Sequence, residues 1–195
     1  MELEKYKQIT NWANELGGVL AISDLKVAFN TDSTASLFRA INEFLRAGEF
    51  IKIKRGFYAT PSAKLSTVAQ RLYPKSYIST GTVLAKEALI GSIPAKKIQS
   101  VKVGLPRIFE CELGTIEFLS IAPKLYFGFR NINGELVATP EKAFLDVCYY
   151  YYKGKTFSFD PQSDIAYDEL DQKVLSNYLP KYDKRFLTYY KKKWG

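Results

Sequence analysis

Short hydroxyl side chains and one guanidinium recur within a single stretch of helical periodicity. They are Ser33, Thr34, Ser36 and Arg39. An arginine can donate two hydrogen bonds to guanine O6 and N7, and short hydroxyl side chains allow a helix backbone to approach the base edges closely. In helix-turn-helix proteins, the amino-terminal turns of the second helix of the motif meet the bases. The four residues therefore predict direct contacts with duplex DNA.

Three basic residues, Lys52, Lys54 and Arg55, follow in a stretch that alternates apolar and basic side chains. Ile51 and Ile53 would face one side of a strand while the lysines face the other. A glycine turn after Arg55 would make this segment one arm of a two-stranded hairpin. The tip of such a hairpin can reach a phosphate or an adjacent minor groove. We expect these three residues to complete the DNA interface.

Three helices must position these side chains. A helix with apolar residues at three- and four-residue steps ends at Gly17, and a short second helix begins with Ser23 as its N-cap. A third begins near Ser33, and its apolar face consists of Leu37, Phe38, Ile41, Phe44 and Leu45. With the hairpin of residues 51–59, this order is typical of a winged helix-turn-helix, predicted for residues 1–62. The same elements could equally form a structural or protein-binding module, because charged hairpins are often solvated edges.

The charge of the chain is unevenly distributed. The formal net charge is +8, which favours a polyanionic partner. Residues 1–62 hold eight Lys/Arg and seven Asp/Glu, a net of +1, whereas residues 63–195 hold twenty and thirteen, a net of +7. DNA binding by the first domain must therefore depend on where a few basic residues lie.

The composition argues against catalysis. There is no histidine, so His-based acid–base and nucleophilic mechanisms are excluded, and two cysteines alone cannot supply the four ligands of a typical zinc site. An enzyme would have to use carboxylates, lysine or tyrosine. The aspartates at 160, 164, 168 and 171 match no calcium-loop spacing and are interpreted as a solvated loop and helix face. We expect no catalytic residues, no metal and no cofactor.

Residues 63–195 are predicted to form a second domain. Strands are expected at 98–103, 107–113, 115–121 and 135–139, with a hairpin turn at Asn133-Gly134. Helices are expected at 65–73, 83–89, 140–152, 167–178 and 182–193, and Thr139, Pro140 and Glu141 give a clear helix start. The helix that follows is apolar nearly all round, so we expect it at the centre of the second core. The chain is therefore predicted to be α+β, a winged helix-turn-helix followed by an α+β domain with a small, mostly antiparallel sheet and C-terminal helices.

A candidate basic patch lies near the end of the chain. It consists of Lys184, Arg185, Lys191, Lys192 and Lys193. Aromatic and apolar residues are interleaved with these cations, so one helix face would dock while the other presents charge. The patch could contact a nucleic acid or an acidic protein, or it could be a solubilising surface.

The expected compartment is the cytoplasm. The first residues are charged and lack the apolar core of a signal peptide, and no apolar run is long enough to span a bilayer, so no membrane contact is expected. Cys111 and Cys148 are expected to be free thiols, as in a reducing cytosol.

Three segments of the chain resemble one known family. They are Gly48–Tyr58, Tyr77–Leu84 and Ala138–Asp146. In this order they are similar to the AbiEi-type antitoxins of bacterial type IV toxin–antitoxin systems. The resemblance covers most of residues 19–152, and its third segment is the most specific.

The resemblance implies a bifunctional protein. The N-terminal domain would repress its own operon by binding inverted repeats in double-stranded DNA, with Ser33, Thr34, Ser36 and Arg39 in the groove and Lys54 and Arg55 on the wing. The C-terminal domain would neutralise a cognate toxin that is similar to nucleotidyltransferases. Two half-sites would require a weak dimer or cooperative monomers. The alternative is an interaction module whose winged helix does not bind DNA and whose C-terminal domain binds a toxin or another defence protein.

Overall fold

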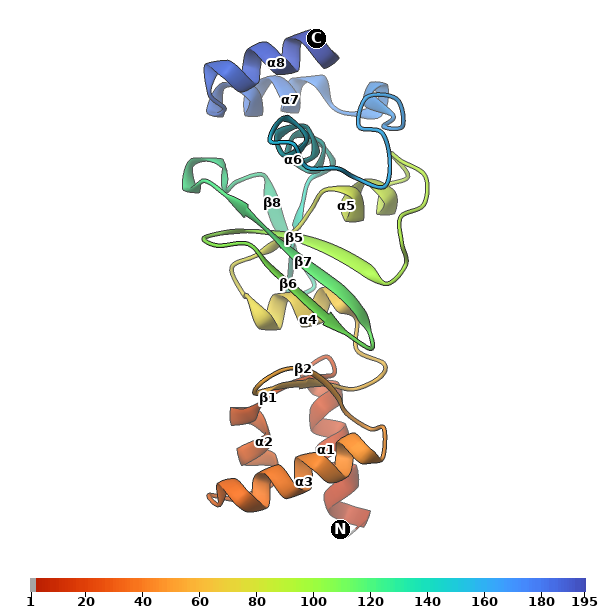
Figure 1. The fold of residues 1–195 in the computed structure, drawn as a ribbon, viewed down its shortest axis with the longest axis vertical. Helices are drawn as coiled ribbons and strands as arrows, with labels where there is room; N and C mark the ends of the chain where they lie inside the picture. Colours follow the sequence, from red (N-terminus) through yellow and green to blue (C-terminus); the bar gives the residue numbers. More distant parts are fainter. Residues whose placement is uncertain (1–2) are drawn as a thin grey trace. The chain divides into compact units, whose positions relative to one another are not determined.

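The computed structural model describes residues 3–195, which form two compact units (Figure 1). The N-terminal unit contains the chain as far as Pro74 together with Ile108–Ile116, and the C-terminal unit contains Lys75–Arg107 and Glu117–Gly195. The predicted domain boundary between residues 62 and 63 stays a prediction. The α+β class is confirmed. No helix of the described residues is both long and apolar enough to cross a membrane.

Helices α1 to α3 of the N-terminal unit lie on one side of a small sheet (Figure 1). The elements in order are α1 (Leu3–Glu15), β1 (Val19–Ala21), α2 (Ile22–Ala28), α3 (Thr34–Arg46), β2 (Ile51–Lys54), β3 (Phe57–Ala59) and α4 (Leu65–Leu72). Strand β3 is central and pairs antiparallel with both β1 and β2. The core beneath the sheet is built around Phe44, whose ring stacks on Phe50 at 4.6 Å and meets Phe29 edge-on at 5.7 Å. Aromatic packing thus links α3 to α2 and to the start of the hairpin.

The start of α2 differs from the prediction. The helix begins at Ile22, so Ser23 is not its N-cap. The carboxylate of Asp24 accepts a hydrogen bond from the backbone N–H of Ala21 at 2.8 Å, and Arg71 of α4 donates to it at 2.6 Å. A carboxylate in the first turn therefore satisfies the backbone N–H of the N-cap residue, and it also forms an ion pair with α4.

The apolar face of α3 is narrower than predicted. Leu37, Ile41 and Phe44 are buried, but Phe38 is 40% exposed. At 100° per residue, Phe38 lies at the edge of the stripe centred on Leu37, Ile41 and Phe44, which explains why only the centre is covered. Ser33 does cap the helix, since its hydroxyl accepts from the backbone N–H of Ser36 at 3.3 Å.

A six-stranded sheet has the strand order β6-β7-β5-β4-β9-β8. The strands are β4 (Tyr77–Ile78), β5 (Lys97–Val103), β6 (Arg107–Cys111), β7 (Gly114–Ile121), β8 (Phe129–Ile132) and β9 (Glu135–Ala138). Strand β4 pairs antiparallel with β5 but parallel with β9, so the sheet is mixed. The predicted hairpin at Asn133-Gly134 is confirmed, with both residues at positive φ and β8 antiparallel to β9.

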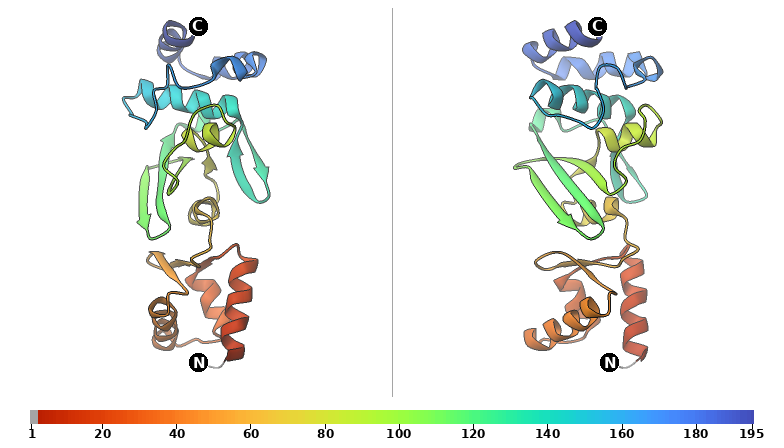
Figure 2. Two further views of the ribbon diagram at one scale, coloured as in Figure 1. Left: turned by 90° about the vertical axis from the view of Figure 1, so that its right-hand side faces the viewer. Right: turned by 45° about the vertical axis from the view of Figure 1, so that its right-hand side comes forward.

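Helix α6 (Pro140–Tyr152) lies between the sheet and the two helices α7 (Gln172–Tyr178) and α8 (Lys184–Trp194) (Figures 1 and 2). Its predicted start is confirmed, because Thr139 accepts from the backbone N–H of Lys142. Its central position is also confirmed, since Ala143, Phe144, Leu145, Val147 and Cys148 are completely buried. Both cysteines are free.

Two helices of the C-terminal unit were predicted with the wrong limits. The predicted helix 83–89 is α5 (Gly81–Lys86), and the predicted helix 167–178 is a 3₁₀ turn (Tyr167–Glu169) followed by α7. The break falls before Asp171, whose carboxylate accepts from the backbone N–H groups of Lys173 and Val174. Asp171 starts a new helix there because its capping bonds replace the intrahelical ones. Two further 3₁₀ turns, Pro123–Leu125 and Leu179–Lys181, complete the unit.

A buried ion pair within α6 is hydrogen-bonded to two hydroxyls at β4 and directly after it. Lys142 and Asp146 are both fully buried, and the Lys142 ammonium donates to the Asp146 carboxylate. The other carboxylate oxygen accepts from the hydroxyls of Ser79 at 2.8 Å and Tyr77 at 3.0 Å. Burial lowers the pKa of Lys142, against the opposing effect of Asp146, and burial with the Asp146 charge raises the pKa of Tyr77. Every member of the cluster therefore depends on the others for its hydrogen bonds.

Breaking this pair from one side should be costly. Lys142→Met leaves the Asp146 charge buried without a counter-ion, which we expect to lower the free energy of unfolding by about 3–5 kcal/mol. The double variant Lys142→Met/Asp146→Leu should be more stable than the single one, although two hydroxyls lose an acceptor. Urea unfolding followed by circular dichroism measures both. Lys86→Met, at an exposed position, is the control. If Lys142→Met lowered the free energy of unfolding no more than Lys86→Met does, the prediction would be contradicted.

Candidate nucleic-acid interface

The first turns of α3 carry the four residues predicted to meet DNA bases. Ser33, Thr34, Ser36 and Arg39 are all exposed, while the opposite side of the helix is buried. Ser36 and Arg39 are three residues apart and share one face. The Ser33 oxygen is engaged in capping, so this hydroxyl is left with its proton as a donor to a ligand. Ser33, Ser36 and Arg39 thus lie along the exposed side of the first turns, whereas Thr34 is exposed at the start of the helix but points about 160° away from Ser36.

The charge of this helix surface is balanced. Arg39 and Arg46 are exposed, and so are Asp32 and Glu43. Among the described residues, no ion pair joins Glu43 to either arginine. The guanidinium groups are therefore available to a ligand, but the acidic groups reduce the attraction for phosphate.

The three basic residues of the β2–β3 hairpin differ in their exposure to solvent. Lys52 and Arg55 are exposed, whereas Ile51 and Ile53 on the other side of β2 are buried. The register shifts between Lys52 and Lys54, a local irregularity that reorients the end of β2. Lys52 and Arg55 can therefore contact a phosphate without breaking any described side-chain interaction.

Lys54 has a different environment. Its ammonium lies 4.7 Å from the ring centroid of Phe57, 5.5 Å from that of Phe109 and 5.8 Å from that of Tyr73. At these distances the electrostatic attraction of ring faces for a cation is effective. Two of the three rings are distant in sequence, so no local pattern could have predicted this cluster. Lys54 therefore has a packing role in addition to any role with DNA.

The candidate basic patch of α8 is also exposed. Lys184, Arg185, Lys191 and Lys192 occupy one side of the helix by their spacing, and Phe186 and Tyr190 on the other side are buried. Lys193 is exposed but falls outside this stripe. At the start of the helix, the backbone N–H of Phe186, with Lys124 and Lys153, lowers the pKa of Asp183.

Acidic residues of the described chain do not gather into a metal site. Among residues 3–195, no group of three His, Cys, Asp or Glu side chains is arranged so that it could hold a metal ion. Asp171 caps α7, and Asp160 and Asp164 form hydrogen bonds within their own loop. These aspartates therefore have local structural roles.

Comparison with known proteins identifies a fold and no family. No family model matches the chain, and no curated protein matches it. A solved structure with a similar fold is the crystal structure of the RV2827C protein from Mycobacterium tuberculosis. The two share 12% sequence identity with a TM-score of 0.60, over 95% of this chain and 74% of that one. At this identity the likeness concerns the fold alone.

The contrast between Lys54 and Lys52 can be tested by stability. Lys54→Ala removes the cation from three rings and should lower the free energy of unfolding by about 1 kcal/mol. Lys52→Ala, two residues away on the same strand, should change it by less than about 0.5 kcal/mol. Urea unfolding of the two variants gives the comparison. Equal midpoints would show that the aromatic contacts of Lys54 do not stabilise the unit.

Proposed function

We propose that the N-terminal unit is a winged helix that binds duplex DNA, and that the protein is a repressor and antitoxin of a type IV toxin–antitoxin system. The observation that carries the DNA-binding part is the exposed side of α3 formed by Ser33, Ser36 and Arg39, on a helix whose other face is buried. The element order α1-β1-α2-α3-β2-β3, with a sheet of order β1-β3-β2, supports the assignment as a winged helix.

In this proposal α3 lies in the major groove. Arg39 reads a guanine, the short hydroxyls allow close approach, and Lys52 and Arg55 on the wing contact phosphates. Lys54 holds the hairpin in place through its aromatic contacts. Because the basic groups are few, binding selects its operator mainly through base contacts, and a palindromic operator takes two copies.

The antitoxin part of the proposal is supported by the sequence resemblance. We propose that the C-terminal unit neutralises a nucleotidyltransferase-like toxin. This would take place in the cytoplasm and would require no catalysis by this chain. The resembling segments Tyr77–Leu84 and Ala138–Asp146 contribute the buried cluster around Lys142. Any direct toxin contact must therefore use other residues.

A protein-binding role for the N-terminal unit is the second candidate. Two apolar side chains, Val27 on α2 and Phe38 on α3, are 66% and 40% exposed. Together with the near-neutral charge of residues 1–62, they would suit a protein partner better than phosphates.

DNA binding is tested with the region upstream of the gene and a scrambled duplex of equal length. Fluorescence anisotropy across a salt series should show selective binding whose affinity falls as salt rises. Arg39→Ala should weaken selective binding by about 1–3 kcal/mol and leave scrambled DNA unaffected. Lys52→Ala should weaken both and reduce the salt slope by about one. Lys86→Ala serves as the control, and equal, feeble binding to both duplexes would favour the protein-binding candidate.

The two halves of the proposed function should be separable. Charge reversal by Lys52→Glu/Arg55→Glu should derepress a reporter placed behind the upstream region, because phosphate contacts become repulsive. The same variant should still protect cells from the cognate toxin. Reporter expression and growth after toxin induction give the two readouts. Loss of both, with unchanged protein level, would mean that the wing does not act on DNA alone.

A further inference from the structure

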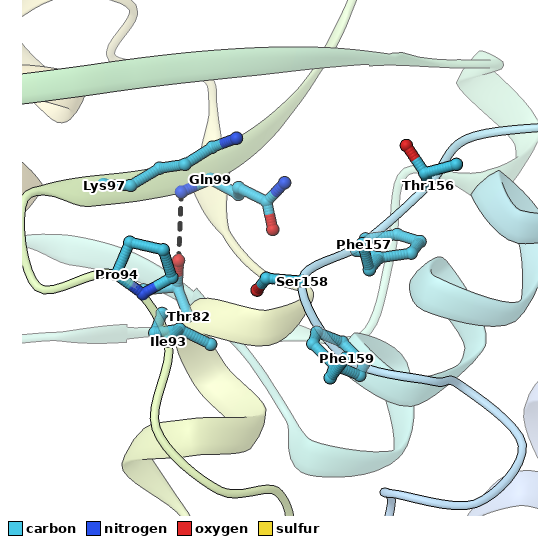
Figure 3. A pocket seen from close by; sticks show the side chains of 9 residues that line it. All are labelled: Thr82, Ile93, Pro94, Lys97, Gln99, Thr156, Phe157, Ser158 and Phe159. Carbon is cyan, nitrogen blue, oxygen red and sulfur yellow. Dashed lines mark hydrogen bonds between the residues drawn. The ribbon is translucent and has the colours of Figure 1, made fainter.

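A small pocket in the C-terminal unit has no part in the proposed function. Its volume is about 70 Å³. It is lined by residues of β5, of α5, of the turn before β5 and of the segment after α6, namely Thr82, Ile93, Pro94, Lys97, Gln99, Thr156, Phe157, Ser158 and Phe159. Figure 3 shows Lys97 and Gln99 on one side of the space and the Phe157–Phe159 segment on the other.

The polar groups that line the pocket are mostly hydrogen-bond donors. The oxygen of Thr82 accepts from the backbone N–H of Gln99 at 3.0 Å, which leaves the hydroxyl proton for a ligand (Figure 3). Within the described residues, the hydroxyls of Thr156 and Ser158 have no hydrogen-bond partner. Lys97 adds a cation, and the lining contains no carboxylate. This set of groups complements negative charge.

A buried network fixes the orientation of the Gln99 amide. Its oxygen accepts from the Thr80 hydroxyl at 2.7 Å, and its nitrogen donates to Glu117 at 2.9 Å. Glu117 also pairs with Lys155 at 2.5 Å and with Lys97 at 3.2 Å. Burial alone would raise the pKa of Glu117, but the hydrogen bonds from Lys155 and Gln99 outweigh it and lower the pKa. Two lysines and one carboxylate leave this side of the pocket with one net positive charge.

The backbone beside the pocket is under strain. Thr80, a β-branched residue, has a φ of +54° and is completely buried. The next residue is Gly81, where a Cβ would lie 2.9 Å from the Phe159 ring. A strained conformation persists only where its surroundings fix it, and such positions cluster at ligand sites. Here the Thr80 hydroxyl donates to Gln99, and the missing Cβ of Gly81 lets the Phe159 ring approach α5.

We propose that this pocket binds a compact oxyanion, such as a carboxylate or a phosphate group, through the Lys97 ammonium and the hydroxyls of Thr82 and Ser158. The pocket has room for a few water molecules and so for one such group, whereas sites for drug-sized ligands start at about 300 Å³. The group can belong to a free ion or to an acidic side chain of a partner protein.

Titration of the ¹⁵N-labelled full-length protein tests the site. Sodium phosphate and sodium acetate replace sodium chloride at constant ionic strength, and the amide signals of Gln99 and Ser158 are followed. We expect saturable shifts with at least one of the two oxyanions and none with chloride. Lys97→Ala should weaken binding by about tenfold, since it removes the cation that lines the pocket. The neighbouring exposed Lys96→Ala, which does not line the pocket, should bind as the wild type does.

The same titration identifies the source of the group and the outcomes that would overturn the proposal. Tighter binding of acetyl-glutamate amide than of acetate would indicate an acidic side chain, and the reverse a free ion. Ser158→Ala, an exposed position without a described partner, gives a second variant should Lys97→Ala unfold. Shifts that do not saturate, or that are equal in wild type, Lys97→Ala and Ser158→Ala, would show that the pocket binds no oxyanion. These results do not depend on whether the protein binds DNA.

Discussion

The C-terminal unit depends on keeping two opposite charges inside its core. Moving Lys142 and Asp146 out of water costs several kcal/mol for each ion, and only close pairing with further hydrogen bonds offsets this cost. The hydroxyls of Tyr77 in β4 and of Ser79 directly after it supply those bonds, and the ammonium lies 4.9 Å from the ring centroid of Phe127. These contacts are possible only when α6 is in register with β4. The pair therefore specifies how helix and sheet pack, which an apolar core of the same volume would do less strictly.

Two consecutive residues connect this buried ion pair to the pocket. Ser79 donates to Asp146, and Thr80 donates to Gln99. Because Ser79 is held by α6 and Thr80 by β5, the backbone between them has little freedom, and Thr80 adopts its left-handed φ. Strand β4 has only two residues, so side-chain bonds rather than a long ladder hold it between β5 and β9. A rigid wall with an oriented amide is the consequence, and this pre-organisation favours binding of a small ligand.

The features that could be predicted from the sequence are the helix caps and turns that depend only on neighbouring residues. The cap of α3 at Ser33, the start of α6 at Thr139 and the Asn133-Gly134 turn all follow from side chains within four positions. Strands β1 and β4 have three and two residues, too few for a periodic pattern. The i,i+4 spacing of Lys142 and Asp146 is visible in the sequence, but it is typical of exposed helices and gave no sign of burial. The rings around Lys54 and the wall of the pocket come from distant segments, and only the fold brings them together.

The N-terminal unit poses the opposite electrostatic problem, since its exposed charges nearly cancel. Residues 1–62 carry a net charge of +1, so the electrostatic part of any DNA affinity is limited to the few basic residues that reach a phosphate. A protein that gains little binding free energy from phosphate contacts binds non-specific DNA weakly and dissociates from it readily. On the proposed function, the free guanidinium of Arg39 and the hydroxyls beside it must then supply most of the discrimination, about 1–3 kcal/mol for each well-placed base contact. One copy with so few contacts is a weak binder, and two copies on a palindrome double the number of base contacts. The low net charge of the first unit is therefore a reason to expect an operator with two half-sites. The strongly basic second unit is then available to bind other partners.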